Sequence, residues 1–179
     1  MKKFKTISLA VVITVALLLS MVMVASAQTT RTYLTSYEYD CLVDPGEMWM
    51  EGGILHIRGR VQSNVDVSDT QELNGISTVV GNADINLKTG YGVFRGTYSF
   101  QPDGIAGTWE GSWIFTGTKG TGVARTVAQG TGALAGKQLF LTMRDDLSPG
   151  DESEEMCAGI GEWSGNILVE GYVLDPAGP

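Results

Sequence analysis

Aromatic side chains are the residues of this sequence best suited to bind another molecule, because clustered rings can line an apolar pocket. They alternate with polar residues in strand-like segments, which places them together on one face. Tyrosine hydroxyl groups among the rings would orient a bound molecule. The candidate ligand-binding residues are Tyr37, Tyr39, Tyr98, Trp109, Trp113 and Trp163. The same rings can instead fill a protein core, and the sequence leaves that alternative open.

The other reactive groups form no recognisable catalytic or metal-binding pattern, so the catalytic residues, if there are any, are unknown. His56 is the only histidine, and one histidine without a fixed partner makes no catalytic triad. Its alternation with Arg58 and Arg60 places it on an outer face. Six carboxylates fall within residues 145–155, but their spacing does not match a calcium-binding EF-hand loop. We expect a solvated acidic loop there, no metal and no cofactor, while calcium binding by the loop stays open.

A second carboxylate pattern is weaker. Glu110 and Glu162 each stand beside a tryptophan, and paired carboxylates can act as acid and base at a glycosidic bond. Alternation directs both side chains outward, so we expect them to be solvated, with a glycosidase as the weaker alternative.

The elements that must position these residues are short strands. Runs rich in Val, Ile, Thr and aromatic residues are separated by turn signals such as Pro102-Asp103-Gly104. The runs cover residues 33–43, 53–67, 75–87, 92–100, 105–117, 122–129, 137–144 and 158–174. No segment shows a convincing helical period. This pattern predicts an all-β fold, a single eight-stranded antiparallel β-barrel.

Alternation also predicts which side chains point inward. The expected inner positions beyond the candidate site include Leu55, Ile57, Phe94, Phe100, Phe115, Leu139, Leu141, Met143, Ile167 and Val169. If the tyrosines of the first run face inward, Cys41 shares their face and Glu38 points outward.

Residues 1–27 read as a signal peptide, with three lysines, an apolar run and an Ala25-Ser26-Ala27 cleavage site. Residues 28–179 would then form one domain outside the cytoplasm, secreted or periplasmic. No second apolar run of spanning length follows, so we expect no stable membrane insertion after cleavage. Removing the three lysines leaves nine basic and twenty acidic residues, a net charge of −11, which disfavours nucleic-acid binding.

The two cysteines, Cys41 and Cys157, are expected to form a disulfide bond in an oxidising compartment. Cys41 ends the first strand-like run and Cys157 precedes the last. The first and last strands of a closed barrel are neighbours, so the bond and the barrel closure support each other.

The stretch from Gly130 to Gly136, with the sequence G-T-G-A-L-A-G, resembles a hairpin of the allene oxide cyclase-like superfamily. That group includes allene oxide cyclases, dirigent proteins and bacterial domains of unknown function. The likeness extends loosely through residues 92–100 and 107–111 and covers about half of the chain after the signal peptide. It implies a calycin-like barrel with a central apolar cavity and often homo-oligomerisation through outer faces. The pair Tyr37-Glu38 is similar to a pair whose glutamate serves the cyclase active site, whereas residues 39–41 depart from that pattern.

Three hypotheses for function follow. The first is an extracytoplasmic barrel that binds a small apolar or aromatic molecule. The second is a cofactor-free cyclase or isomerase that acts on a flexible apolar substrate in the barrel cavity. The third is a structural or interaction protein with a filled barrel. A ligand-sized cavity would exclude the third, and a buried carboxyl or phenol group in that cavity would favour the second.

Overall fold

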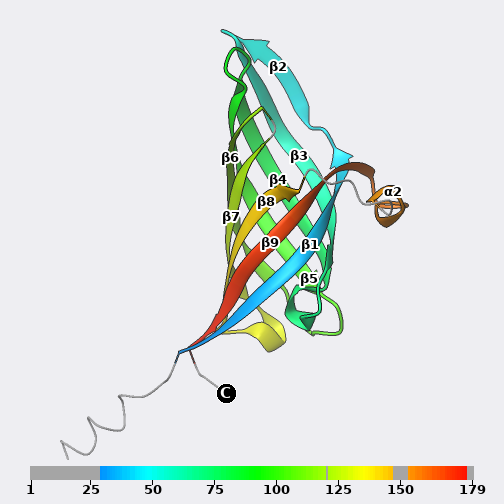
Figure 1. The fold of residues 1–179 in the computed structure, drawn as a ribbon, viewed down its shortest axis with the longest axis vertical. Coiled ribbons are helices and arrows are strands. Elements are labelled where there is room, and N and C mark those ends of the chain that lie inside the picture. Colours follow the sequence, from blue (N-terminus) through cyan, green and yellow to red (C-terminus); the bar gives the residue numbers. More distant parts are fainter. Residues whose placement is uncertain (1–28, 120, 147–152, 177–179) are drawn as a thin grey trace, which may run out of the picture. The chain divides into compact units, whose positions relative to one another are not determined.

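The computed structural model describes residues 29–119, 121–146 and 153–176, and it confirms the all-β fold. Eight antiparallel strands close into a barrel, and one further strand lies outside it (Figure 1). The strands are β1 (Thr30–Asp44), β2 (Glu47–Glu51), β3 (Ile54–Val67), β4 (Gly75–Asn86), β5 (Tyr91–Pro102), β6 (Trp109–Thr118), β7 (Thr121–Gly130), β8 (Gln138–Asp146) and β9 (Glu162–Asp175). The short helical segments are η1 (Gln71–Leu73), η2 (Gly132–Leu134) and α2 (Ser153–Met156). The predicted signal peptide lies outside the described residues.

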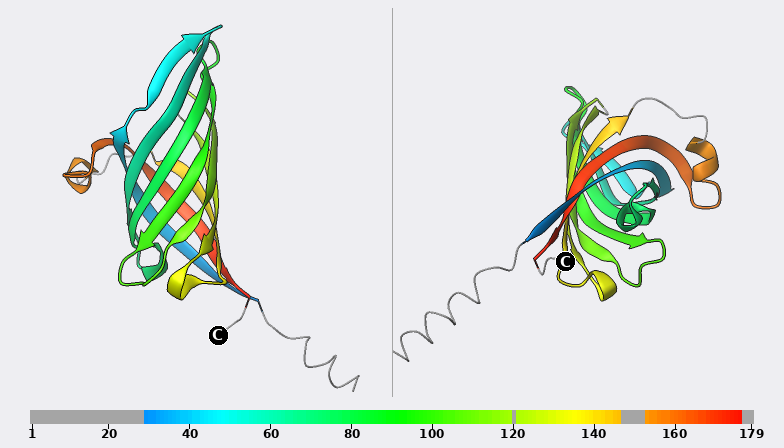
Figure 2. Two further views of the ribbon diagram at one scale, coloured as in Figure 1. Left: turned by 180° about the vertical axis from the view of Figure 1, so that it is seen from behind. Right: turned by 60° about the horizontal axis from the view of Figure 1, so that its bottom comes forward.

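The barrel is a meander closed by its first strand. Strands β3 to β9 follow one another as hydrogen-bonded neighbours, and β1 pairs with both β9 and β3. Figure 2 shows the resulting ring of strands from two further directions. Directly opposed residues of antiparallel strands share a face, so the registers define which side chains point into the barrel.

One end of the barrel, here called the filled end, is plugged by side chains. Phe100 and Trp109 are fully buried there, and they share a core with Leu73 of η1 and Leu134 of η2. Gly132 has a φ of +57°, and a Cβ at this position would lie 2.2 Å from the carbonyl oxygen of Ala106. The glycine-rich stretch therefore lets the β7–β8 connection pack against the β5–β6 connection.

Strand β2 is an element that the sequence analysis missed. The first predicted strand ends at residue 43 and the second begins at residue 53, but the chain between them continues in the same direction as β1 and also pairs with β3. The β1–β3 pairing runs from Tyr37↔Val67 to Asp44↔Val61, and β2 then takes over as the partner of residues 54–58. Within the described chain β3 is the only strand paired with β2. This opposite end of the barrel is called the open end below.

A β-bulge in β3 corrects the prediction that Arg60 points outward. The register with β4 passes from Ile57↔Ala83 to Arg60↔Gly81, so β3 contains one extra residue between these pairs. Gly59 has a φ of +70°, which a glycine adopts without strain. The bulge shifts the alternation of β3, and Arg60 points into the barrel together with the later even-numbered residues.

The disulfide bond between Cys41 and Cys157 is confirmed, with the two Cα atoms 5.4 Å apart. Both cysteines are buried, and the bond ties β1 to the segment that precedes β9. A buried disulfide is compatible with an oxidising extracytoplasmic compartment. In the described part of the chain, no helix is long and apolar enough to span a membrane.

Candidate functional site

A cavity of about 230 Å³ occupies the barrel interior between the filled end and the open end. Two chemically different walls enclose it. Residues of β1 and β3 form a polar wall, and residues of β4 to β9 form a mainly apolar wall. The lining residues are Glu38, Asp40, Arg60, Gln62, Asn64, Val79, Phe94, Trp113, Phe115, Ala124, Thr126, Met143, Asp145 and Ile167.

The polar wall contains two acidic residues that line the cavity, Glu38 and Asp40. Together with the adjacent Asp66 they form what we call the carboxyl cluster. Glu38 is directly opposite Asp66 in the β1–β3 register, and the two are only 2% and 3% exposed. Asn64 Nδ2 donates a hydrogen bond to Glu38 Oε1 at 3.1 Å. Gln62 Nε2 donates one to Asp40 Oδ2 at 3.2 Å.

Burial raises the pKa of each acid in the carboxyl cluster, because the charged form is poorly solvated there. The pKa of Glu38 rises well above its usual value by burial, and the nearby Asp66 adds to the rise. Burial and the neighbouring Glu38 also raise the pKa of Asp40 well above its usual range. Burial brings the pKa of Asp66 to about 7, although Glu38 and Ser77 oppose the change. The cluster therefore retains protons at a pH where most carboxyl groups are ionised.

The hydrogen-bonding geometry supports the same conclusion. Glu38 lies within hydrogen-bonding reach of both Asp40 and Asp66. Glu38 Oε2 and Asp66 Oδ2 are buried and meet no donor group among the described residues. An ionised carboxylate can only accept hydrogen bonds, whereas a protonated one also donates. Protons held between the acids supply the missing donors.

The polar wall also contains a cation, Arg60. Burial lowers the pKa of its guanidinium group, and the attraction of Asp40 opposes this change. The guanidinium carbon lies 5.9 Å from the centre of the Phe94 ring, a cation–π distance. Its buried Nε has no acceptor among the described residues. Arg60 therefore joins the polar wall to the aromatic surface and keeps one donor free.

The apolar wall is built around three aromatic rings in contact, one pair stacked and one pair edge to face. Phe94 packs against Trp113 and Phe115, with ring centres 6.3 Å away in each case. A Cβ at Gly81 would lie 2.8 Å from the Trp113 ring, so the indole reaches across Gly96 of β5 and lies on the backbone of β4. The buried Trp113 Nε1 has no acceptor among the described residues. A ligand oxygen in the cavity could accept hydrogen bonds from both Trp113 and Arg60.

The six predicted ligand-binding residues are not brought together. Trp113 lines the cavity. Tyr98 and Trp109 point inward as expected, but both are fully buried and belong to the packed core. Trp163 is half-buried and donates a hydrogen bond from Nε1 to Asn166 Oδ1 at 2.9 Å. It is not among the described residues that line the cavity.

Tyr37 and Tyr39 lie on the outside of the barrel, which corrects the expected orientation of the first strand. Their neighbours Glu38 and Asp40 line the cavity, and adjacent residues of a strand point to opposite faces. The two tyrosine rings contact each other edge to face at 5.2 Å. The orientation of Glu38, which the sequence left open, is inward.

The remaining sequence candidates lie apart from the cavity. His56 Nδ1 pairs with Asp84 Oδ1 at 2.6 Å on the outer face. Glu110 and Glu162 are exposed, as expected. Most of the acidic loop lies outside the described residues, and among the described residues no three His, Cys, Asp or Glu side chains are arranged so that they could hold a metal ion.

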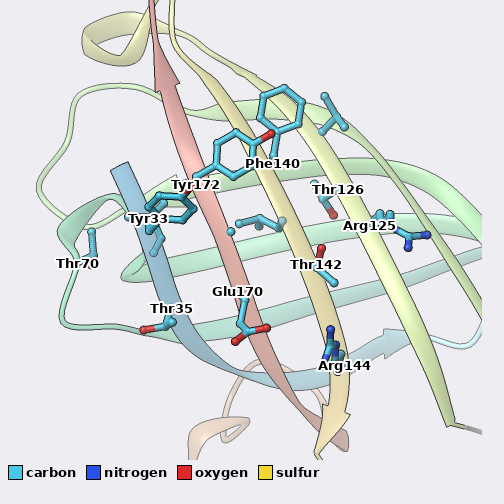
Figure 3. Close-up of a pocket in the computed structure, with 14 residues that line it drawn as sticks. Tyr33, Thr35, Thr70, Arg125, Thr126, Phe140, Thr142, Arg144, Glu170 and Tyr172 are labelled. Atoms are coloured by element: carbon cyan, nitrogen blue, oxygen red, sulfur yellow. The ribbon is translucent and has the colours of Figure 1, made fainter. Parts of the chain in front are cut away.

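A larger hollow of about 660 Å³ lies on the outer face of β1, β7, β8 and β9. Figure 3 shows Tyr33, Tyr172 and Phe140 grouped in it, with the two arginines farther along the strands. The Phe140 and Tyr172 rings stack at 5.0 Å. Its charged residues Arg125, Arg144 and Glu170 are exposed, so water competes for their interactions. The inner cavity is the better candidate site because its polar groups are buried and partly unpaired.

Comparison with known proteins found no match to any family model, curated protein or solved structure. The resemblance to the allene oxide cyclase-like superfamily therefore stays a prediction.

Proposed function

We propose that this protein is an exported β-barrel that binds a small, mainly apolar or aromatic molecule with one uncharged polar group. The observation that carries the proposal is the inner cavity, whose aromatic wall faces a wall of buried and partly unpaired polar groups. Rings such as Trp113 and Phe94 would contact the apolar part of the ligand. A hydroxyl or carbonyl oxygen of the ligand would accept hydrogen bonds from Arg60 and Trp113.

The carboxyl cluster restricts the ligand further. Glu38 and Asp40 lie in the cavity wall, and an anionic ligand beside them would oppose the ionisation of either acid and compete with Asp40 for Arg60. Arg60 is the one basic residue among the described lining residues. A hydroxyl group suits the site better, because it can donate to a carboxyl oxygen and accept from a donor group.

A second function, a cofactor-free cyclase or isomerase, is favoured by one specific observation: the carboxyl groups of Glu38 and Asp40, whose pKa values are raised by burial, line the cavity. A protonated Glu38 could give its proton to a ligand oxygen, while Asp40, the acid whose ionised form is favoured by the nearby Arg60, takes a proton from a ligand carbon. The ligand then loses and gains one proton, and the product is an isomer of the substrate. Carboxyl groups with raised pKa values can act as proton donors at a pH where ordinary carboxyl groups are ionised.

The cavity weighs against a completely filled barrel, although the filled end matches that description. Export is supported by the buried disulfide bond, together with the signal-like character of residues 1–27. An extracytoplasmic location would also expose the barrel to small molecules outside the cell.

The binding proposal can be tested with 2-naphthol, a small aromatic molecule with one hydroxyl group. The chain beginning at Gln28 is produced in an oxidising compartment, and binding is measured by calorimetry. Replacing Trp113→Leu should weaken binding at least tenfold, because ring stacking and an N–H donor are lost. The matched variant Phe140→Leu, in the outer hollow, should bind as the wild type does. Equal binding of 2-naphthoate and 2-naphthol, or loss of binding only in Phe140→Leu, would contradict the proposal.

The two functions are separated by the molecule that co-purifies with the protein. Native mass spectrometry of the wild type gives the mass of a retained ligand. Recovery of two isomers of that mass from the wild type, but of one from Glu38→Gln, would identify an isomerase. The same single species from both proteins would support simple binding.

A further inference from the structure

The β2–β3 hairpin continues the inner wall of the barrel beyond the cavity. Met48 is opposite Ile57 and Met50 is opposite Leu55 in the β2–β3 register. Ile57 is itself opposite Ala83, which is opposite Phe94 of the cavity wall. Opposed residues share a face, so both methionines lie on the inner face. The same rule places Trp49, opposite His56, on the outer face.

These methionines are exposed although they lie on the inner face. Met48 is 58% exposed and Met50 is 72% exposed, whereas Ile57 in the adjoining strand is 4% exposed. Figure 1 shows β2 beside β3 at the open end, beyond the region where β1 and β9 complete the barrel. We call the surface formed by Met48, Met50 and Leu55 the lip. Exposed apolar surface of this kind usually marks a binding site.

The aromatic wall continues toward the lip. A Cβ at Gly117 or Gly122 would lie 2.6 or 2.7 Å from the Phe115 ring, so this ring covers the backbone of both glycines. Gly117 is opposite Gly92, which is opposite Ile85, which is opposite Leu55. Apolar surface therefore extends from the cavity to the hairpin, with glycines reducing the side-chain bulk between them.

We propose that the lip holds the apolar end of an elongated ligand whose polar end reaches Glu38, Asp40 and Arg60. This inference rests on the proposed binding function and defines its ligand as an uncharged amphiphile that enters polar end first. Leu55 and Gln62 are opposite Ile85 and Val79, and the six steps between these two residues on β4 correspond to about 20 Å of strand, which sets the scale of the ligand. Methionine suits such a surface because its side chain adapts to flexible apolar partners.

Charge argues against an anionic membrane as the occupant of the lip. Glu47 and Glu51 flank the methionines, and the chain after residue 27 has twenty acidic and nine basic residues. Such a surface is repelled by anionic lipid headgroups. An uncharged tail that emerges from the cavity meets no such barrier.

The chain after residue 27 has four methionines, Met48, Met50, Met143 and Met156, and this allows a direct test. Met143 lines the cavity, whereas Met156 lies in α2. With methyl-labelled methionine, hexan-1-ol should shift the NMR signal of Met143 alone. Dodecan-1-ol should shift Met143, Met48 and Met50, and Met156 should remain unchanged with both probes.

Affinity provides a second readout that needs no assignment of the lip signals. The wild type should bind dodecan-1-ol more tightly than hexan-1-ol, by up to about fourfold for each added methylene group that is buried. The double variant Met48→Gln and Met50→Gln should lose most of this gain and bind hexan-1-ol normally. Trp49→Gln, on the opposite face of β2, should retain the gain.

The outcomes separate the two proposals. If the double methionine variant binds hexan-1-ol and still shows the full affinity gain for dodecan-1-ol, this result would overturn the proposed role of the lip and leave the proposed binding function intact. Failure of either alcohol to affect Met143 would overturn both. Signals of Met48 and Met50 that depend on protein concentration without any alcohol would assign the lip to a second copy of the chain and overturn the inference.

Discussion

Replacing Asp66→Asn should stabilise the protein at neutral and alkaline pH. The native state holds Asp66 with a pKa of about 7, compared with an ordinary value of 3.8. Between these values the native state binds more protons than the unfolded state, so its stability falls as the pH rises. The contribution is fully present below pH 3.8 and is lost once the pH passes about 7. Asparagine has a similar shape, cannot ionise and retains an oxygen that accepts a hydrogen bond from Glu38.

The size of this effect follows from the shift. A pKa difference of one between the folded and unfolded states is worth about 1.4 kcal/mol. The wild type should therefore lose about 4 kcal/mol of its free energy of unfolding through Asp66 by pH 8. Urea unfolding of the wild type and the variant at intervals from pH 4 to pH 8 measures it. The difference between the two unfolding free energies should grow through this range and flatten above about pH 7. Asp69→Asn, at an exposed position, is the matched control. If the difference in unfolding free energy between Asp66→Asn and the wild type does not change with pH, the carboxyl cluster does not hold protons as described.

Two further predictions concern the fold. Trp109→Ala should lower the free energy of unfolding by about 3 to 5 kcal/mol, because it opens a cavity in the filled end. Ile114 is exposed on the same strand, so Ile114→Ala should change the free energy of unfolding far less. Equal losses of unfolding free energy in the two variants, measured with urea, would show that Trp109 is not part of the core. Replacing both Cys41→Ser and Cys157→Ser should cost about 5 kcal/mol for a loop spanning 116 residues. An unchanged thermal midpoint would indicate that barrel closure does not depend on the bond.

Much of the barrel could be predicted because its apolar wall follows the simple rule of alternation. Trp109, Trp113 and Leu139 stand on strands whose two faces differ clearly, and all three point inward. The disulfide was predictable for a related reason, since strand order in a closed barrel makes the ends of the chain neighbours.

The polar wall could not be predicted in the same way because it reverses the rule. On β1 the carboxyl groups point inward and the tyrosines outward, so the more apolar face of this strand is not the one that faces the interior. On β3 the bulge at Gly59 changes the face on which Arg60, Asn64 and Asp66 lie. An isolated glycine within a strand pattern is a known bulge signal, and it stood between two arginines in the sequence. The opposition of Glu38 and Asp66 needs the β1–β3 register, which connects residues far apart in the chain.

The bulge at Gly59 makes the chemistry of the barrel interior depend on the length of the chain at one position. Without the extra residue, the remainder of β3 would turn by one face. Val61, Val65 and Val67 would then line the interior, and Arg60, Gln62, Asn64 and Asp66 would meet solvent. The β3 part of the polar wall would then become apolar, while Glu38 and Asp40 would still point inward from β1. A single codon inserted or deleted here would exchange one kind of interior for the other, which gives this barrel architecture a short route between unrelated ligands.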